Sequence, residues 1–215
     1  GWSGQWQSLT GAMRLNGQTS LSGPAAEVGS ATGRSAWAQS GDSRRTGRIL
    51  SSSYNDSTNN TVWMSYLFQT ESTATAQYAA FELYNGNFTD GQQTLRLGQL
   101  NDAGVGSNTS YYAQMNEDDP SAVTLGAKNT SVNMVIVEFD FNTGSNNDVV
   151  NFWFNPTTAG QAATGTITGQ DIEFDRIALA SFGGNDDNLF DEIYFGNTVN
   201  DVSSVAVPEP SSAFL

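Results

Sequence analysis

Short runs in which every second residue is apolar constrain the fold of this chain more than any other feature of its sequence. Every second residue of the run 61–69 is large and apolar: Val62, Met64, Tyr66 and Phe68. Successive side chains of a β-strand point to opposite sides, so these four share one face. Trp63 and Leu67 fall on the other face, and we therefore predict a central strand that is covered on both sides.

The same alternation returns along most of the chain. It occupies the runs 77–84, 94–97, 132–141, 149–154, 172–182 and 188–196. Turn-forming residues such as Asn85-Gly86-Asn87 separate the runs, and no segment has a convincing 3.6-residue period. The segment 157–168, rich in Ala, Gly and Thr, is predicted to be a loop. We predict about ten to thirteen antiparallel strands in one all-β domain over residues 1–202, with 203–215 as a C-terminal tail.

Composition excludes several classes of function. The chain has no Cys and no His, which removes disulfides, thiolate metal sites, zinc enzymes and Ser-His-Asp triads. Its net charge is −14, from 22 acidic residues against 8 basic ones. A field of this sign repels nucleic acid and anionic membrane surfaces, so we expect neither as a partner.

A resemblance to a known family lies in two segments near the C-terminal end of the domain. They are 173–177 (EFDRI) and 190–198 (FDEIYFGNT), followed by Asp201-Val202. Together they resemble the closing strands of concanavalin-A-like, laminin-G-like (LamG) domains. The segments 1–4 (GWSG), 61–65 (TVWMS) and 150–156 (VNFWFNP) follow the order of the same group. The resemblance implies a jelly-roll sandwich of two antiparallel sheets outside the cell, with functions from sugar binding to adhesion, and no single activity.

A second resemblance concerns the tail. It contains a VPEP motif, made of Val207, Pro208, Glu209 and Pro210. The motif resembles the head of a PEP-CTERM sorting signal, in which it precedes a membrane-spanning helix in exported bacterial proteins. Phe214 and Leu215 would begin such a helix. A bilayer span needs about 20 apolar residues, so we expect no membrane span in this form.

Both ends of the chain point to an exported protein. Residues 1–4 include no initiator Met and no signal-peptide pattern, as expected after removal of a leader. We therefore predict a location at the bacterial cell surface or in the extracellular matrix. We assign the VPEP motif, Phe214 and Leu215 to sorting and assembly, with the tail contacting its own domain or another copy of the chain.

Hard oxygen ligands gather around the start of the last predicted strand. The candidates are Asp186, Asp187, Asn188 and Asp191. Because Ca²⁺ takes six to eight oxygen ligands, they form a candidate calcium site, the one cofactor that the sequence suggests. The alternative is an ordinary hairpin loop of Gly, Asn and Asp, in which Asp191 accepts backbone hydrogen bonds.

Aromatic side chains are candidates for stacking on a sugar ring. The residues considered for a carbohydrate site are Tyr111, Tyr112, Trp153, Tyr194 and Glu192. Adjacent strand residues face opposite ways, so one of Tyr111 and Tyr112 is a candidate for exposure. Tyr194 and Glu192 share a face that could line a groove. For Trp153, inside an apolar run, a place in the core is the favoured alternative.

Two pairs of carboxylates bear on catalysis: Glu173 with Asp175, and Glu138 with Asp140. Each pair resembles the start of the Glu-x-Asp-x-x-Glu signature of laminarinase-type glycoside hydrolases, which need two carboxylates. The third Glu is absent in both places. We therefore predict that the chain is not an enzyme, and we assign no catalytic residue.

Three functions follow from these observations. The first is a non-catalytic, exported surface or matrix protein that self-assembles or adheres. The second is a carbohydrate-binding, lectin-like module with a polysaccharide partner. The third, least favoured, is a polysaccharide-active hydrolase or lyase. The order rests on the lack of a recognisable cluster of polar and aromatic residues in a lone domain.

Overall fold

The structure is a computed structural model, and it describes residues 2–11, 13–15, 21, 35–38, 43–57, 61–71, 73, 78–100, 109–116, 122–142, 144, 146–182 and 188–204. Within these ranges the chain forms 14 β-strands and one short 3₁₀ helix, η1 (Val199–Asp201). The prediction of an all-β chain is confirmed. Among the described residues there is no helix with the length and hydropathy needed to cross a bilayer.

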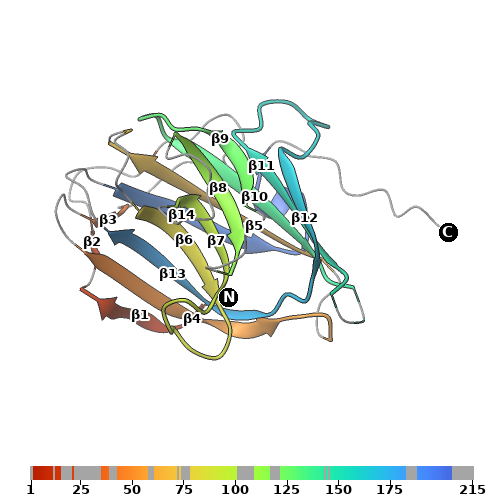
Figure 1. The fold of residues 1–215 in the computed structure, drawn as a ribbon, viewed down its shortest axis with the longest axis horizontal. Coiled ribbons are helices and arrows are strands. Elements are labelled where there is room, and N and C mark those ends of the chain that lie inside the picture. The colour runs from red at the N-terminus through yellow and green to blue at the C-terminus, as the bar shows by residue number, and fades with distance from the viewer. Residues whose placement is uncertain are drawn as a thin grey trace.

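The strands form two antiparallel sheets of seven strands each, which lie one behind the other in Figure 1. Sheet A contains, in spatial order, β1 (Trp2–Thr10), β4 (Arg44–Tyr54), β13 (Phe174–Phe182), β6 (Tyr78–Tyr84), β7 (Gln93–Gln99), β8 (Ser110–Met115) and β9 (Val123–Ala127). Sheet B contains β12 (Gly165–Gln170), β11 (Asp148–Phe154), β10 (Asn133–Asp140), β5 (Thr61–Thr70), β14 (Asn188–Gly196), β3 (Ala36–Ala38) and β2 (Arg14–Leu15). This arrangement confirms the predicted jelly-roll sandwich.

The main core lies between the sheets and follows from the period of two. All four alternating residues predicted to share a face of β5 belong to it, as do Phe81 and Leu97 of sheet A and Val137 of sheet B. The rings of Tyr66 on β5 and Phe81 on β6 stack across the interface with centroids 4.8 Å apart. Alternation therefore identified the residues that face the main core, because the face on which a strand residue lies depends only on its position in the sequence.

The prediction of a loop over 157–168 is wrong at its C-terminal end. Residues 165–168 belong to β12, which pairs with β11 at the edge of sheet B. An edge strand with one half-exposed face needs few apolar residues, and Ile167 is the one side chain of β12 in the core. Its Gly- and Thr-rich sequence therefore gave no strand signal.

The outer face of sheet B, turned away from sheet A, is also covered. Val199 and Val202 of the η1 region pack there against Trp63 and Trp153, whose rings stack at 5.4 Å. The hydroxyl of Ser65 donates a hydrogen bond to the Val202 carbonyl at 2.7 Å. The interpretation of both tryptophans as core residues is confirmed, since they are 1% and 2% exposed.

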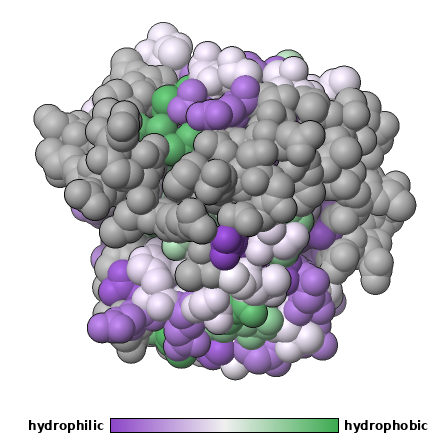
Figure 2. All heavy atoms as spheres, turned by 90° about the vertical axis from the view of Figure 1, so that its left-hand side faces the viewer, coloured by the Kyte–Doolittle hydropathy of each residue, from purple (hydrophilic) through white to green (hydrophobic). Residues whose placement is uncertain are grey.

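The described surface is polar. On the side drawn in Figure 2, the coloured residues are mostly hydrophilic or intermediate, with green hydrophobic patches among them. Trp6 on the edge strand β1 is the one large hydrophobic side chain exposed among the described residues.

Candidate functional site

The outer face of sheet A, turned away from sheet B, carries a row of polar residues. Glu82 on β6, Arg96 on β7 and Gln114 on β8 stand directly opposite one another across the three strands. They point outward because the alternate residues of these strands, such as Phe81, point into the core. All three are nevertheless buried, with at most 1% of each residue exposed.

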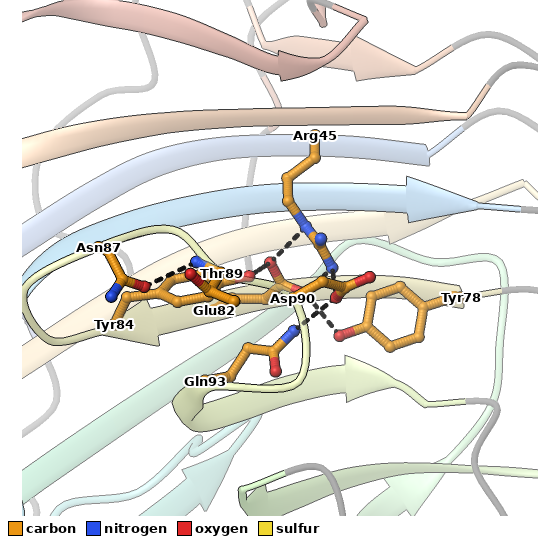
Figure 3. Close-up of polar contacts among 8 residues, drawn as sticks. All are labelled: Arg45, Tyr78, Glu82, Tyr84, Asn87, Thr89, Asp90 and Gln93. Atoms are coloured by element: carbon orange, nitrogen blue, oxygen red, sulfur yellow. Dashed lines mark hydrogen bonds and ion pairs between the residues drawn. The ribbon is translucent and has the colours of Figure 1, made fainter.

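Glu82 is the centre of a dense network (Figure 3). Its Oε1 accepts a hydrogen bond from Nη2 of Arg45 at 3.1 Å, and its Oε2 lies 3.0 Å from Nε of the same guanidinium in an ion pair. The Tyr78 hydroxyl donates to Oε1 at 2.7 Å, and the Tyr84 hydroxyl donates to Oε2 at 2.8 Å. Beside it, Nη2 of Arg96 donates to Oε1 of Gln114 at 2.7 Å. Three hydrogen bonds and the ion pair with Arg45 thus compensate the buried Glu82 carboxylate, as a charge out of water requires.

The loop between β6 and β7, residues 85–92, lies over this network. Asp90 of the loop accepts from Arg45 at 2.8 Å and from the Gln93 amide at 3.1 Å (Figure 3). The ring of Phe88 lies against Gly47, where a Cβ atom would come within 2.5 Å of it. The Arg176 guanidinium stands 5.2 Å from the same ring. Gly47 is therefore needed so that the loop can lie flat on the sheet.

The electrostatics of the network are set by burial. Burial raises the pKa of Glu82, although Arg45 and the two tyrosine hydroxyls act in the opposite direction. For Arg45, burial opposes the charge, but Glu82 and Asp90 outweigh it and raise its pKa. The hydrogen bond from Arg45 lowers the pKa of Asp90. Glu82 and Arg45 are paired and buried, and Asp90 pairs with Arg45 from the exposed loop, so the network is a clamp that holds the loop rather than an open site.

An open pocket lies at the end of sheet A next to this loop. It measures about 240 Å³ and is lined by Asn85, Thr94, Met115, Asn116, Gln170, Asp171 and Glu173. The lining comes from the β6–β7 loop, the start of β7, the end of β8 and the connection between β12 and β13. Six of the seven side chains are polar, and Met115 supplies the apolar part.

Hydrogen bonds between loops hold the pocket in shape. The Asn85 amide donates to Oε2 of Glu173 at 2.8 Å, and the Asn55 amide donates to Oε1 at 3.4 Å. The Thr94 hydroxyl donates to the Glu173 carbonyl at 3.0 Å. Asn116 ends β8 with a φ of 48°, in the left-handed region that Asn tolerates better than most residues. The polar lining is thus preorganised from three directions.

The neighbouring Asp175 has a separate role, which is structural. It accepts from the backbone N–H of Gly86 at 3.1 Å and forms an ion pair with Arg176 at 2.6 Å. The hydrogen bond from Arg176 lowers the pKa of Asp175. The second candidate pair lies on the outer face of sheet B, where Glu138 is buried and accepts from Asn151 at 2.9 Å. The two pairs therefore belong to different sheets.

The aromatic residues considered for sugar stacking are mostly inside the molecule. Tyr111, Tyr112 and Trp153 are at most 5% exposed and offer no ring face to a ligand. Tyr111 lies in the core with its hydroxyl 2.9 Å from that of Thr70. Tyr112 does point to the outer face of sheet A, but that face is covered and Tyr112 packs with Leu100 there.

Tyr194 and Glu192 are half-buried and contact each other. The Tyr194 hydroxyl donates to the Glu192 carboxylate, and Tyr194 packs at the margin of the cluster that contains Trp63. Glu192 has a φ of 49°, at an irregularity in the pairing of β14 with β5. Neither residue lines the pocket.

The candidate calcium ligands fall partly outside the described residues. Asp186 and Asp187 are not among those that the structure describes. Asn188 is buried and its amide donates to the Ser181 hydroxyl at 2.8 Å. Asp191 accepts from the backbone N–H groups of Leu21 and Glu192 at 2.8 and 3.0 Å, the anchoring role given above as the alternative. In the described ranges no three His, Cys, Asp or Glu residues are grouped to hold a metal ion.

The sorting and assembly residues also lie outside the described ranges. These are Val207, Pro208, Glu209, Pro210, Phe214 and Leu215. Their predicted roles therefore stay predictions.

Comparison with known proteins identifies the fold. No protein-family model and no curated protein sequence matches this chain. Among solved structures, the potassium-bound carbohydrate recognition domain of Emp46p aligns with a TM-score of 0.54 at 10% identity, over 90% of this chain and 88% of that one. A structure of botulinum neurotoxin type C, whose cell entry depends on two ganglioside molecules, aligns with a TM-score of 0.54 at 10% identity.

The toxin match covers 92% of this chain but only 44% of the toxin chain. The alginate lyase AlgAT5 of polysaccharide lyase family 7 aligns with a TM-score of 0.50 at 5% identity, over 76% of this chain and 77% of that one. Identities this low show a shared fold only. The chain has the concanavalin-A-like jelly-roll fold, on which both binding domains and enzymes are built.

Proposed function

We propose that this chain is a non-catalytic carbohydrate-binding domain and that one sugar ring binds in the pocket at the end of sheet A. The observation that carries the proposal is the pocket itself: exposed amide, hydroxyl and carboxylate groups converge there from four segments, and hydrogen bonds between loops hold them. Sugar hydroxyls both donate and accept, and side chains of these types offer both functions.

The small volume of the pocket favours a ligand contact limited to one sugar ring. Most ligand pockets measure roughly 300–1,000 Å³, and this one measures about 240 Å³. We expect it to hold one ring of a chain that lies across the end of the sandwich. Asn116, Gln170 and Glu173 would bind the hydroxyls of the ring, above a floor to which the buried Met115 contributes.

The proposed setting is outside a bacterial cell. The VPEP motif supports it. The self-assembling or adhesive role is predicted to act through the tail, residues 203–215, or through edge strands, and the pocket favours the carbohydrate-binding alternative over it. Of the solved structures above, two are binding proteins by their own descriptions and one is a lyase, so an assay for polysaccharide cleavage belongs in the test.

The proposal is tested on a glycan array, with and without EDTA. We expect binding that Glu173→Gln weakens, because the carboxylate loses its charge and one acceptor. Glu71→Gln is the matched control, because Glu71 is exposed and lies away from the pocket. Glu71 follows Thr70, which contacts Tyr111 near the start of β8, whereas Met115 of the pocket is the last residue of β8. If the unaltered chain binds no glycan at millimolar concentration, the proposal fails. Cleavage of any bound polysaccharide would contradict the non-catalytic part.

A further inference from the structure

We infer that the end pocket selects sugars that carry a free amino group and disfavours uronates. The inference rests on the proposed carbohydrate-binding function and names the class of sugar. Its basis is the charge of the lining: Asp171 and Glu173 are both exposed carboxylates, and among the described residues that line the pocket none is cationic.

The cation nearest in sequence to the two pocket carboxylates is already paired with another residue. Arg176 follows Asp175 directly and forms with it a two-point ion pair, with contacts of 2.6 and 2.8 Å. Its guanidinium also stands 5.2 Å from the Phe88 ring, on the outer face of sheet A. Among the described residues, no cation forms an ion pair with the two pocket carboxylates, and a ligand cation can take that place.

The two carboxylates differ in how they are held, and both have capacity to accept. Glu173 is oriented by the amides of Asn85 and Asn55, each of which donates to a different oxygen. Asp171 makes no side-chain hydrogen bond or ion pair with the described residues. A carboxylate can accept about four hydrogen bonds, and an ammonium group offers three donors. A sugar ammonium between Asp171 and Glu173 would therefore satisfy acceptors that the protein leaves open.

Local charge decides the preference, and the net charge reinforces it. At physiological ionic strength the Debye length is about 8 Å, so most of the net charge of −14 is screened at the pocket. The two lining carboxylates are not screened from a group in contact with them. A uronate would place a third negative charge beside them, while a neutral sugar would gain only hydrogen bonds.

A divalent cation is the competing occupant. Ca²⁺ requires six to eight oxygen ligands, and the described residues contain no group of three or more His, Cys, Asp or Glu placed to hold a metal. Two carboxylates, of which Glu173 is already oriented by two amide donors, fit a single positive charge with directional donors better. A chelator separates the two possibilities.

The test is a calorimetric titration of the intact chain with three matched oligosaccharides at pH 6: a glucosamine oligomer, its fully N-acetylated form and an oligouronate. Each exposed ion pair contributes up to about fivefold in affinity. We expect the amino form to bind about tenfold more tightly than the acetylated form, with the uronate weakest. Asp171→Asn and Glu173→Gln should each remove part of the preference, and 0.5 M salt should reduce it, while Glu71→Gln should leave it unchanged.

The outcomes separate this inference from the function on which it rests. If the acetylated form or the uronate binds as tightly as the amino form, the charge preference is overturned and the carbohydrate-binding function stands. If EDTA abolishes binding of the amino form, a bridging metal replaces direct recognition and the inference is likewise overturned. If none of the three binds and the glycan array is also blank, the function itself fails.

Discussion

Replacing Arg45 by Met should be among the most damaging single changes in this domain. Met has a long apolar side chain, so most of the packing against Phe182, which lies 4.8 Å from the guanidinium, would be retained. What disappears is the charge that faces Glu82, which is fully buried. The two tyrosine hydroxyls would remain as donors, but both are neutral.

The size of the effect follows from burial. Removing one partner of a buried ion pair costs about 3–5 kcal/mol, because the other charge is left uncompensated. The contact with Asp90 adds little, since that side chain is 72% exposed. Total stabilities of single domains are about 5–15 kcal/mol, so the variant would lose a large share of its free energy of unfolding.

The pH dependence distinguishes this explanation from a simple packing defect. Burial raises the pKa of Glu82 in the folded state, so the folded chain binds this proton more tightly than the unfolded chain does. Such a carboxyl reduces stability once the pH rises above its unfolded pKa, and the loss is complete above the folded pKa. Without Arg45 the pKa rises further. The cost of Arg45→Met should therefore be largest near pH 7 and shrink toward pH 4.

Urea unfolding at pH 7 and pH 4.5 measures both effects. Arg176→Met is the matched control on the same face of the same sheet, where the ion pair with Asp175 is partly exposed and should contribute about 1 kcal/mol or less. The reasoning is refuted if Arg45→Met costs no more than this control. It is also refuted if the cost of Arg45→Met is the same at both pH values.

Two further predictions concern the backbone and the core, and both are measured by chemical unfolding. Gly98→Ala should cost at least about 2 kcal/mol, because Gly98 has a φ of 138° and an added Cβ would lie 2.3 Å from the Ala79 carbonyl oxygen. Gly86→Ala, with a φ of 73° and open space around it, should cost about 1 kcal/mol, and an equal loss at both positions would contradict the steric argument. Phe81→Ala should cost about 3–5 kcal/mol, against about 0.5 kcal/mol for the exposed Trp6→Ala, and similar losses would show that Phe81 is not central to the core.

The sequence was sufficient to locate seven of the 14 strands and to predict which side of β5 faces the main core. Val62, Met64, Tyr66 and Phe68 lie on the core face as predicted, and Trp63 is buried on the other side. This part succeeded because the two faces of a strand are determined by residue spacing, without knowledge of which strands are neighbours.

The pocket could not be predicted in the same way. Asn85, Asn116 and Asp171 come from three separate connections, and they meet only because β13, β6, β7 and β8 are neighbours in sheet A. Strand order is set by long-range packing and leaves no local pattern. The one local signal was the Asn-Gly-Asn turn at 85–87, which predicted a hairpin but not what its first residue would contact.

The aromatic candidates show a second limit. Tyr112 points away from the main core, as alternation allows, yet only 5% of it is exposed. A two-layer sandwich would leave the outer face of sheet A open to water, and sequence reasoning that assumes two layers expects an exposed ring there. The satellite cluster of Tyr112, Leu100 and Ala180 shows that this face is covered.

The loop between β6 and β7 connects the two unusual features of sheet A. At one end Asn85 lines the pocket and holds Glu173, and near the other end Asp90 is bound by Arg45. A pocket built from loops is precise only if those loops are fixed. Here the loop that forms one wall of the pocket is joined, through Asp90, to the Arg45 that pairs with the fully buried Glu82. We therefore interpret the charged network under the loop as the support of the pocket. Removing its charges from water costs free energy at the centre of sheet A, and in return the exposed residues at the end of the sheet have a defined position.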